Sequence, residues 1–180
     1  MGADEDAAFD AFAVSAWQRL RWTAYLLVGD EHLAEDLTQT ALARTYVSWR
    51  RLRSDPGSDA MAYARRVLVN ANIDRHRRRR LTEVPFPGLG APDADPPEAT
   101  TAAAAEDAVA DRDQLVRLLA GLSARERRIV VLKYLYDLSD PAVAEELGTS
   151  VGTVKSTASR ALTKLRVQHA VAEPTPSGKA

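Results

Sequence analysis

The sequence predicts an all-α protein made of two small helical domains joined by a flexible linker. Apolar residues recur at helical spacing on both sides of residues 81–106, and no sustained alternation of apolar and polar residues indicates a strand. Residues 81–106 hold five of the nine prolines and lose the apolar periodicity, which is typical of a linker. A chain of 180 residues, 46% of them apolar, can bury a core in each half. We expect domains at 7–80 and 107–169, followed by a disordered tail at 170–180.

Three helices are expected in the first domain. Apolar residues from 9 to 27 fall on one helical face, and the pair Gly29–Asp30 ends that helix and caps the next. The sequence Ser54–Gly57 is a turn, and the third helix runs from near Asp59 to Arg80. On the second helix, the stripes expected to face the core consist of Leu33, Leu37, Ala41, Leu42, Tyr46 and Trp49.

The second domain is predicted to begin with a helix from about Ala108 to Gly121. The sequence Ser123–Glu126 then forms a capping box, in which a serine and a glutamate three residues apart satisfy each other's backbone N–H groups. This capping box opens a helix that we expect to continue through Tyr136.

Residues 139–166 predict a helix-turn-helix. Asp140 can cap a short helix whose first turn accommodates Pro141, and Gly148 permits the left-handed turn that ends it. Ser150 can cap the following helix. The predicted buried stripe is Val143, Leu147, Val151, Val154, Ala158, Leu162 and Leu165, with Lys155, Ser156, Ser159, Arg160 and Lys164 on the other face.

A positive, hydroxyl-bearing helix face after a tight turn suits a helix that reads the DNA major groove. An ordinary helical hairpin with a solvated charged face is the alternative that spacing alone leaves open. The capping residues, the glycine and the basic face together favour the helix-turn-helix.

Charge is segregated along the chain although the net charge is only −1. Residues 1–43 carry two basic and eight acidic side chains, and residues 44–80 carry eleven basic and three acidic. Residues 81–114 carry one basic and eight acidic, and residues 115–180 carry ten basic and six acidic. The two basic blocks indicate a polyanionic partner.

The third helix ends in Arg75, His76 and the run Arg77–Arg80. Cations at a helix C-terminus complement the helix dipole, but that effect accounts for one or two arginines and not for a run of four. A phosphate-binding surface is therefore the favoured interpretation. On the second helix, Asp36 and Gln39 share one face, for which a solvated surface is the alternative.

Several classes of function are excluded or unsupported. The chain has no cysteine, which excludes disulfides, thiolate metal sites and a cysteine nucleophile. No apolar run approaches the ~20 residues that span a bilayer, and the acidic start is no secretory signal. The three histidines are scattered and form neither metal-ligand spacing nor a nucleophile–base pair. We expect a cytoplasmic protein without enzymatic activity, metal or cofactor.

The motifs at Ala24–Leu42, Tyr63–Arg79, Leu122–Tyr134 and Gly152–Arg166 occur in a fixed order over most of the chain. Together they resemble the extracytoplasmic-function (group 4) sigma factors of bacterial RNA polymerase, in particular an actinobacterial sigma-E-like branch. The resemblance implies a promoter-specific initiation factor with sigma region 2 at 7–80 and sigma region 4 at 107–169. It also implies core RNA polymerase as partner, through the clamp helices of the largest subunit and the flap, together with promoter DNA and a regulatory anti-sigma factor.

The resemblance assigns roles by position. Core polymerase binding falls on Asp36, Gln39 and Thr40, the last of which stands where the family often has an acid. Recognition and melting of the −10 element fall on Arg53, Ser54, Asp55, Arg65, Arg66, Asn70, Asp74, Arg77 and Arg78. Reading of the −35 element falls on Thr153, Lys155, Ser156, Ser159, Arg160 and Lys164, and Ser159 is smaller than the residues often found there.

A free-standing helix-turn-helix regulator that binds duplex DNA is the competing hypothesis. It leaves the first domain and its acidic helix unexplained. Dependence on core polymerase separates the two, because a sigma factor should bind promoters weakly alone and tightly with the core enzyme.

Overall fold

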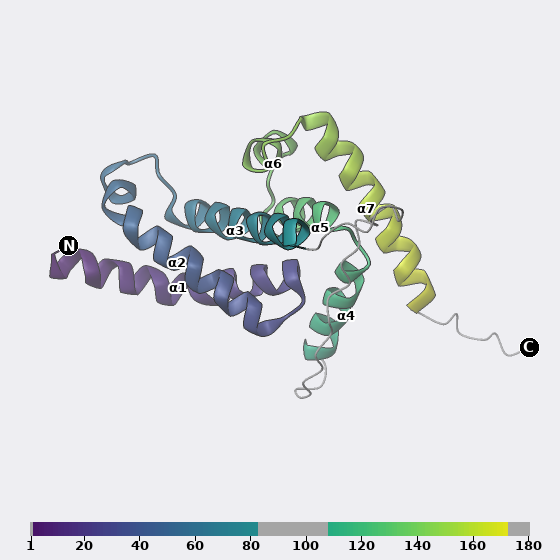
Figure 1. The fold of residues 1–180 in the computed structure, drawn as a ribbon, viewed down its shortest axis with the longest axis horizontal. Coiled ribbons are helices and arrows are strands. Elements are labelled where there is room, and N and C mark those ends of the chain that lie inside the picture. Colours follow the sequence, from purple (N-terminus) through teal and green to yellow (C-terminus); the bar gives the residue numbers. More distant parts are fainter. Residues whose placement is uncertain (1, 83–107, 173–180) are drawn as a thin grey trace, which may run out of the picture. The chain divides into compact units, whose positions relative to one another are not determined.

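The computed structural model describes residues 2–82 and 108–172, and all regular structure in these two ranges is helical. The chain divides into two compact units, Met1–Ala91 and Pro92–Ala180, which we describe separately (Figure 1). The all-α, two-domain prediction is confirmed. Most of the predicted linker, from residue 83 onward, and residues 173–180 of the predicted tail lie outside the described ranges.

The first unit consists of α1 (Ala3–Val28), α2 (Glu31–Ser54) and α3 (Ala60–Thr82), each of which packs against the other two (Figure 1). Gly29 ends α1 in the left-handed conformation with φ 72°, and its N–H donates to the Tyr25 carbonyl at 2.7 Å. Asp30 caps α2 by accepting from the Leu33 N–H at 2.7 Å. The predicted boundary between these helices is therefore confirmed at the level of its hydrogen bonds.

Small and hydroxyl-bearing residues allow the helices of this unit to approach closely. Leu20, Leu27 and Leu68 form the apolar centre and are almost fully buried. Thr38 and Thr45 are also fully buried, and each hydroxyl donates to the carbonyl four residues earlier at 2.7 Å. Because these bonds satisfy the hydroxyls inside their own helix, α2 buries two polar residues that apolar periodicity does not reveal.

An aromatic cluster joins the start of α1 to the second half of α2. Phe9 meets Tyr46 and Trp49 edge to face, with ring centroids 4.9 and 5.3 Å apart, and Phe12 lies 5.1 Å from Trp49. Trp49 is buried, as predicted. The prediction for Tyr46 is wrong, because its side chain is 39% exposed and its hydroxyl donates to an Asp6 carboxylate oxygen at 2.9 Å at the surface.

The second unit begins with α4 (Ala108–Ala120) and α5 (Ala124–Val130). Both hydrogen bonds of the predicted Ser123–Glu126 capping box are present at the start of α5. The helix does not stay α-helical to Tyr136 as predicted, because Val131–Leu135 form a π-helical turn, η1. Asp137 follows with a positive φ of 51°.

The helix-turn-helix consists of α6 (Asp140–Glu146) and α7 (Val151–Ala172), which pack against each other (Figure 1). Gly148 has φ 59°, and the bonds from the Gly148 N–H to Glu145 and from the Thr149 N–H to Ala144 close the end of α6. Ser150 accepts from the Thr153 N–H at 3.1 Å and caps α7, as predicted.

Two details of this motif differ from the prediction. Ser139, and not Asp140, caps α6, because its side chain accepts from the Ala142 N–H while Asp140 is already the first helical residue. Val151, the first residue of α7, is 37% exposed and not buried as predicted. Thr157 and Ala161 complete the buried stripe with the predicted Val154 and Ala158.

Candidate functional surfaces

The outward face of α7 carries most of the residues predicted to read DNA. Lys155, Ser156, Ser159 and Arg160 are exposed, and Thr153 is partly exposed beside the Ser150 cap. The Lys155 ammonium contacts no other described residue through a hydrogen bond or an ion pair. The surface therefore offers one unengaged cation and several hydroxyls at the start of the helix.

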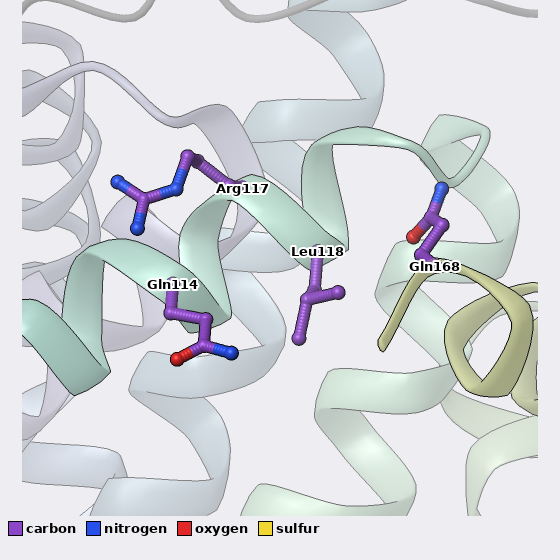
Figure 2. Close-up of a pocket in the computed structure, with 4 residues that line it drawn as sticks. All are labelled: Gln114, Arg117, Leu118 and Gln168. Atoms are coloured by element: carbon purple, nitrogen blue, oxygen red, sulfur yellow. The ribbon is translucent and has the colours of Figure 1, made fainter. Parts of the chain in front are cut away.

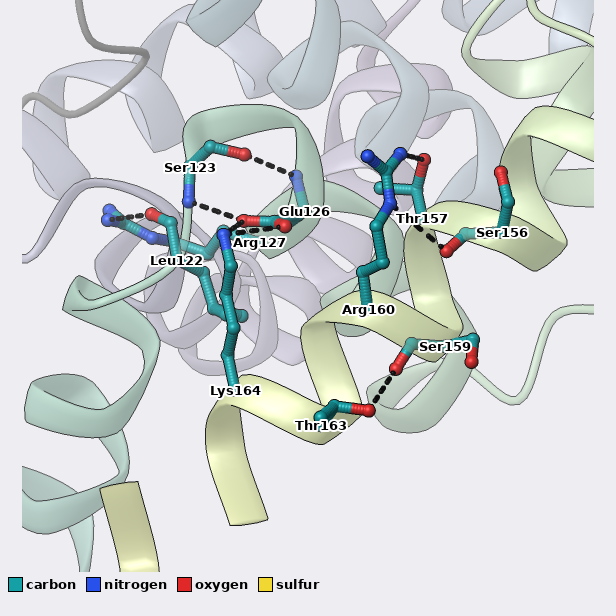
Figure 3. A network of polar contacts seen from close by, with 10 residues as sticks. All are labelled: Leu122, Ser123, Glu126, Arg127, Ser156, Thr157, Ser159, Arg160, Thr163 and Lys164. Atoms are coloured by element: carbon teal, nitrogen blue, oxygen red, sulfur yellow. Dashed lines mark hydrogen bonds and ion pairs between the residues drawn. The ribbon is translucent and has the colours of Figure 1, made fainter. Parts of the chain in front are cut away.

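Arg160 lies back along its own helix (Figure 3). Its Nε donates to the Ser156 carbonyl and its Nη2 to the Thr157 hydroxyl, both at 3.4 Å. Bonds of this length at an exposed site are weak, so the guanidinium can leave them for a stronger acceptor such as a phosphate.

Lys164, the last residue predicted to contact the −35 element, is engaged within the protein. Its ammonium lies 2.9 Å from both carboxylate oxygens of Glu126 (Figure 3). Glu126 also accepts from the Ser123 N–H at 2.9 Å and has a side chain only 8% exposed.

The electrostatics of Glu126 follow from these contacts. Burial raises the pKa of its carboxyl, but hydrogen bonds from Lys164 and Ser123 outweigh burial and hold the pKa below its ordinary value. A lowered pKa in the folded state stabilises the second domain above the ordinary glutamate pKa. This stabilisation is lost as the pH falls through the lowered value.

Arg127 is a buried arginine that the sequence analysis did not single out. Its guanidinium donates to the carbonyls of Leu119, Ala120 and Leu122 at 2.9 to 3.2 Å, so it closes the end of α4. Desolvation lowers the pKa of Arg127 from its ordinary value. Nothing in the local pattern distinguishes it from its neighbour Arg128, because its partners are set by the α4–α5 turn.

A hollow of about 460 Å³ lies between α4 and α7 and is lined by Gln114, Arg117, Leu118 and Gln168 (Figure 2). The Gln168 amide lies against Gly121, where an added Cβ would lie 1.9 Å from its Nε2. The C-terminal half of α7 thus contacts the α4–α5 turn directly. No group of three or more His, Asp or Glu side chains that could hold a metal occurs within residues 2–82 and 108–172.

In the first unit, Asp36 and Gln39 are exposed on α2, and Thr40 is partly exposed beside them. Neither Asp36 nor Gln39 forms a hydrogen bond or ion pair with another described part of the chain. By contrast, the neighbouring Glu35 pairs with Arg21 at 3.1 Å. Asp36 and Gln39, which are predicted to bind a partner, therefore take no part in the ion pairs between α2 and α1.

The turn between α2 and α3 is organised by its own polar side chains. The Asp55 carboxylate accepts from the Gly57 N–H at 3.0 Å and from the Ser58 hydroxyl at 2.8 Å, and these bonds lower the pKa of Asp55. The Ser54 hydroxyl donates to the Arg51 carbonyl, and Arg53 is an exposed cation beside the turn, as are Arg50 and Arg51. Asp59 caps α3 by accepting from the N–H groups of Met61 and Ala62. The sequence predicted a helix start near Asp59 but not this capping role.

The predicted DNA-binding residues of α3 divide into one buried and several exposed side chains. Arg65 is only 8% exposed and belongs to the helix interface. Its neighbour Arg66 is exposed, and so are the polar residues Asn70 and Asp74. Arg77 and Arg78 are exposed near the end of the helix, where they carry the positive surface outward.

The fold defines a class of protein with two helical units, one of which contains a helix-turn-helix, the motif of many DNA-binding proteins. Comparison with family models makes the class specific: sigma-70 region 2 matches residues 8–82, and sigma-70 region 4 matches residues 112–165. The chain belongs to the sigma-70 family of RNA polymerase sigma factors, in its extracytoplasmic-function group.

The relatives agree with this assignment. The RNA polymerase sigma-E factor of Streptomyces coelicolor is 39% identical over 158 residues, which is 88% of this chain and 84% of that protein. The ECF RNA polymerase sigma factor SigL of Mycobacterium tuberculosis is 31% identical over 165 residues, 89% of this chain and 86% of SigL.

Solved structures show the same fold. The Bartonella quintana sigma factor RpoE, solved with the anti-sigma factor NepR, matches with a TM-score of 0.66 and 24% identity over 92% of this chain and 99% of RpoE. CnrH, solved with the cytosolic domain of CnrY, matches with a TM-score of 0.63 and 20% identity over 93% of this chain and 91% of CnrH.

The chain is therefore an alternative sigma factor, the subunit that directs RNA polymerase to particular promoters. The competing hypothesis of a free-standing regulator has no support, because region 2 is present as well as the helix-turn-helix. None of the described helices is long and apolar enough to cross a membrane.

Proposed function

We propose that this sigma factor docks on core RNA polymerase through the Asp36–Gln39 face of α2. The observation that carries the proposal is that both side chains are exposed and unengaged, whereas Glu31 and Glu35 on the same helix pair with Arg21. Exposed polar groups without an internal partner are available to hydrogen-bond donors on another protein. Thr40, partly exposed beside Gln39, adds a neutral hydroxyl where the family often has a charge.

In the same proposal, the α2–α3 turn and the exposed side of α3 bind the −10 element. Arg53 and Arg66 would contact phosphates, together with Arg77 and Arg78 at the far end of α3. A base can be read on its pairing edge only after it has left the stack, so this surface acts on melted DNA. The internal bonds of Asp55 and Ser54 support a role in shaping the turn, and the burial of Arg65 supports a role in holding α3.

The outward face of α7 would read the −35 element as duplex. Lys155 and Arg160 supply charge, and the hydroxyls of Thr153, Ser156 and Ser159 supply donors and acceptors for base edges. The N-terminal residues of such a helix enter the major groove, and these five residues lie in its first three turns.

Binding to core polymerase tests the docking face. The full-length chain should bind purified core enzyme tightly, and Asp36→Ala and Gln39→Ala should each weaken binding by about tenfold, because each removes a hydrogen bond to a polar or charged group. Asp4→Ala is the matched control, since Asp4 is an exposed acid in the first turn of α1. Equal affinity of all three variants would contradict the proposal for this face, and no binding by a folded wild type would contradict the polymerase partnership.

We further propose that the protein acts in the cytoplasm, where its polymerase and promoters are, and without enzymatic activity or a cofactor. A protein inhibitor of the anti-sigma class is the proposed regulator, supported by the RpoE relative that was solved with NepR. Co-purification of a tagged chain from its host, with the bound protein identified by mass spectrometry, tests this. Recovery of core polymerase alone under all growth conditions would argue against such a regulator.

A further inference from the structure

We infer that Lys164 and Glu126 form a strut that sets the position of the recognition helix α7, and that Lys164 does not contact DNA. The inference rests on the proposed reading of the −35 element by α7 and concerns how that helix is held. It changes the role of one residue that sequence pattern alone assigns to the DNA-binding face.

The first argument is the direction in which Lys164 projects. Successive residues of an α-helix are rotated by about 100°, so Lys155, Ser156, Ser159 and Arg160 fall within an arc of about 140°. The buried residues Val154, Thr157, Ala158 and Ala161 lie on the opposite side. Lys164 is about 180° from Lys155, about 40° beyond Arg160 and about 20° from Thr157, which places it between the outward face and the buried side, with its side chain 51% exposed.

The second argument is distance along the helix. Lys164 lies thirteen residues beyond Val151, which corresponds to about 20 Å at 1.5 Å per residue. The major groove is about 12 Å wide, and a recognition helix contacts bases with its N-terminal residues. Lys155 lies about 6 Å and Arg160 about 14 Å beyond Val151 along the helix axis, so Lys164 is the farthest of the predicted contacts from the N-terminal residues that enter the groove.

The third argument is what Lys164 contacts. Its ammonium binds a carboxylate that is almost fully buried and that also closes the capping box of α5 through Ser123 (Figure 3). One turn further along α7, Gln168 lies against Gly121 in the α4–α5 turn. Arg127 ties the same turn to the end of α4 through three carbonyls.

These contacts make the α4–α5 turn a fixed support for α7. Removing Lys164 would leave the almost fully buried Glu126 carboxylate without its cation and with the Ser123 N–H as a remaining donor, which carries a larger penalty than loss of an ion pair between two exposed residues. The helix would then settle at a different angle or with greater freedom. Both changes misplace Lys155, Ser159 and Arg160 relative to the groove.

A charge-neutral variant of Glu126 distinguishes a positioning role of Lys164 from a direct DNA contact, because the two roles predict opposite changes in promoter affinity. Glu126→Gln keeps an acceptor for the Ser123 N–H, since a capping box tolerates glutamine, but it loses the charge that holds Lys164. If Lys164 is a strut, holoenzyme containing Glu126→Gln should bind its promoter about three- to tenfold more weakly than wild type. If Lys164 is a DNA contact that Glu126 restrains, the same variant should bind more tightly, and that result would overturn the inference.

The probe is a promoter duplex isolated from a random-sequence pool by wild-type holoenzyme. Lys164→Met should weaken binding to a similar extent, and the double variant should bind no more weakly than the weaker single variant, because both remove one interaction. Lys164→Arg keeps a cation and donors at this position and should restore most of the affinity.

Salt dependence gives an independent readout. Neutralising a residue that contacts a phosphate lowers the slope of log affinity against log salt by about one, while a positioning residue leaves the slope unchanged. Lys155→Met is the matched control on the same helix and should lower the slope. An equal decrease for Lys164→Met would overturn the inference.

The slopes are measured a second time with the free full-length chain and a random-sequence duplex, which requires no polymerase. Failure to form holoenzyme would contradict the proposed function, while the slopes of the free chain still test the role of Lys164. Circular dichroism of each variant verifies that the helices are formed.

Discussion

Arg127 shows how a single buried charge holds the second domain together. The last carbonyls of a helix have no partner within it, and Leu119 and Leu122 at the end of α4 are almost fully buried, so water has little access to them. The Arg127 guanidinium satisfies Leu119, Ala120 and Leu122 at once because its donors form a planar fork. A lysine ammonium also has three donors, but they diverge from one nitrogen and do not form the planar fork that meets these carbonyls.

Replacement of Arg127 should therefore destabilise the second domain strongly. We expect Arg127→Met to cost about 2 kcal/mol of unfolding free energy, because buried carbonyls lose their donors. Arg127→Lys should recover little of the loss. Arg125→Met is the control, since Arg125 is exposed on the same helix and, among the described residues, donates only to the Thr149 hydroxyl. Urea denaturation followed by circular dichroism measures both, and equal effects of the two methionine variants would contradict the role given to Arg127.

For single residues, the sequence pattern predicts whether a side chain is exposed better than it predicts which residue that side chain contacts. Ser159 and Asp36 lie on the surface because helical periodicity places them there. The partners of Lys164 cannot be predicted in the same way, because Glu126 lies 38 residues earlier and meets it only after α5 and α7 pack. The burial of Arg65 is likewise a product of packing between helices, since its neighbour Arg66 has the same chemistry and is exposed.

The helices themselves are closely predicted where their ends carry specific side chains. Gly29, Asp30 and Ser150 mark boundaries that the structure reproduces, because each satisfies backbone groups that any helix end leaves open. The prediction is wrong where two neighbouring residues could both cap, as at Ser139 and Asp140. It also misses the π-helical turn η1, whose extra residue leaves no signature in apolar spacing.

The left-handed backbone of Gly148, in the turn between α6 and α7, should make substitutions there destabilising. Gly148 has φ 59°, and a Cβ added there would meet nothing within 4 Å, so only the backbone conformation disfavours a side chain. Gly148→Ala should cost about 1 kcal/mol, and Gly148→Asn should cost less because asparagine tolerates the left-handed region. Denaturation of both variants checks the order, and an alanine variant as stable as wild type would contradict the strain argument.

At the scale of the whole molecule, the two compact units suggest separate unfolding. The three tryptophans, Trp17, Trp22 and Trp49, all belong to the first unit, so their fluorescence is blind to the second. Circular dichroism at helical wavelengths reports both units. We expect the two probes to give different transition midpoints in urea, with Arg127→Met shifting the circular dichroism curve and leaving the tryptophan curve in place. A single shared transition in the wild type and the variant would show that the units unfold together.

Basic and acidic residues are segregated along the whole chain. The basic residues gather between 44 and 80 and again beyond 115, with acidic stretches before each, so a net charge of −1 conceals two positive surfaces. Region 2 and region 4 occur in one chain, and in the proposed function each of the two basic blocks binds a different part of the promoter. Binding through two linked sites raises affinity beyond that of either one.

The turn after α2 has a consequence for the entropy of binding. The Asp55 carboxylate already accepts hydrogen bonds from the Gly57 N–H and the Ser58 hydroxyl in the absence of a ligand, and these bonds order the turn. A loop that is ordered beforehand has few conformations to lose when it is occupied, so little free energy of ordering is subtracted from its affinity. Ser58→Ala would loosen this loop without touching its positive charges, and a base arriving there would then have to organise its own binding site.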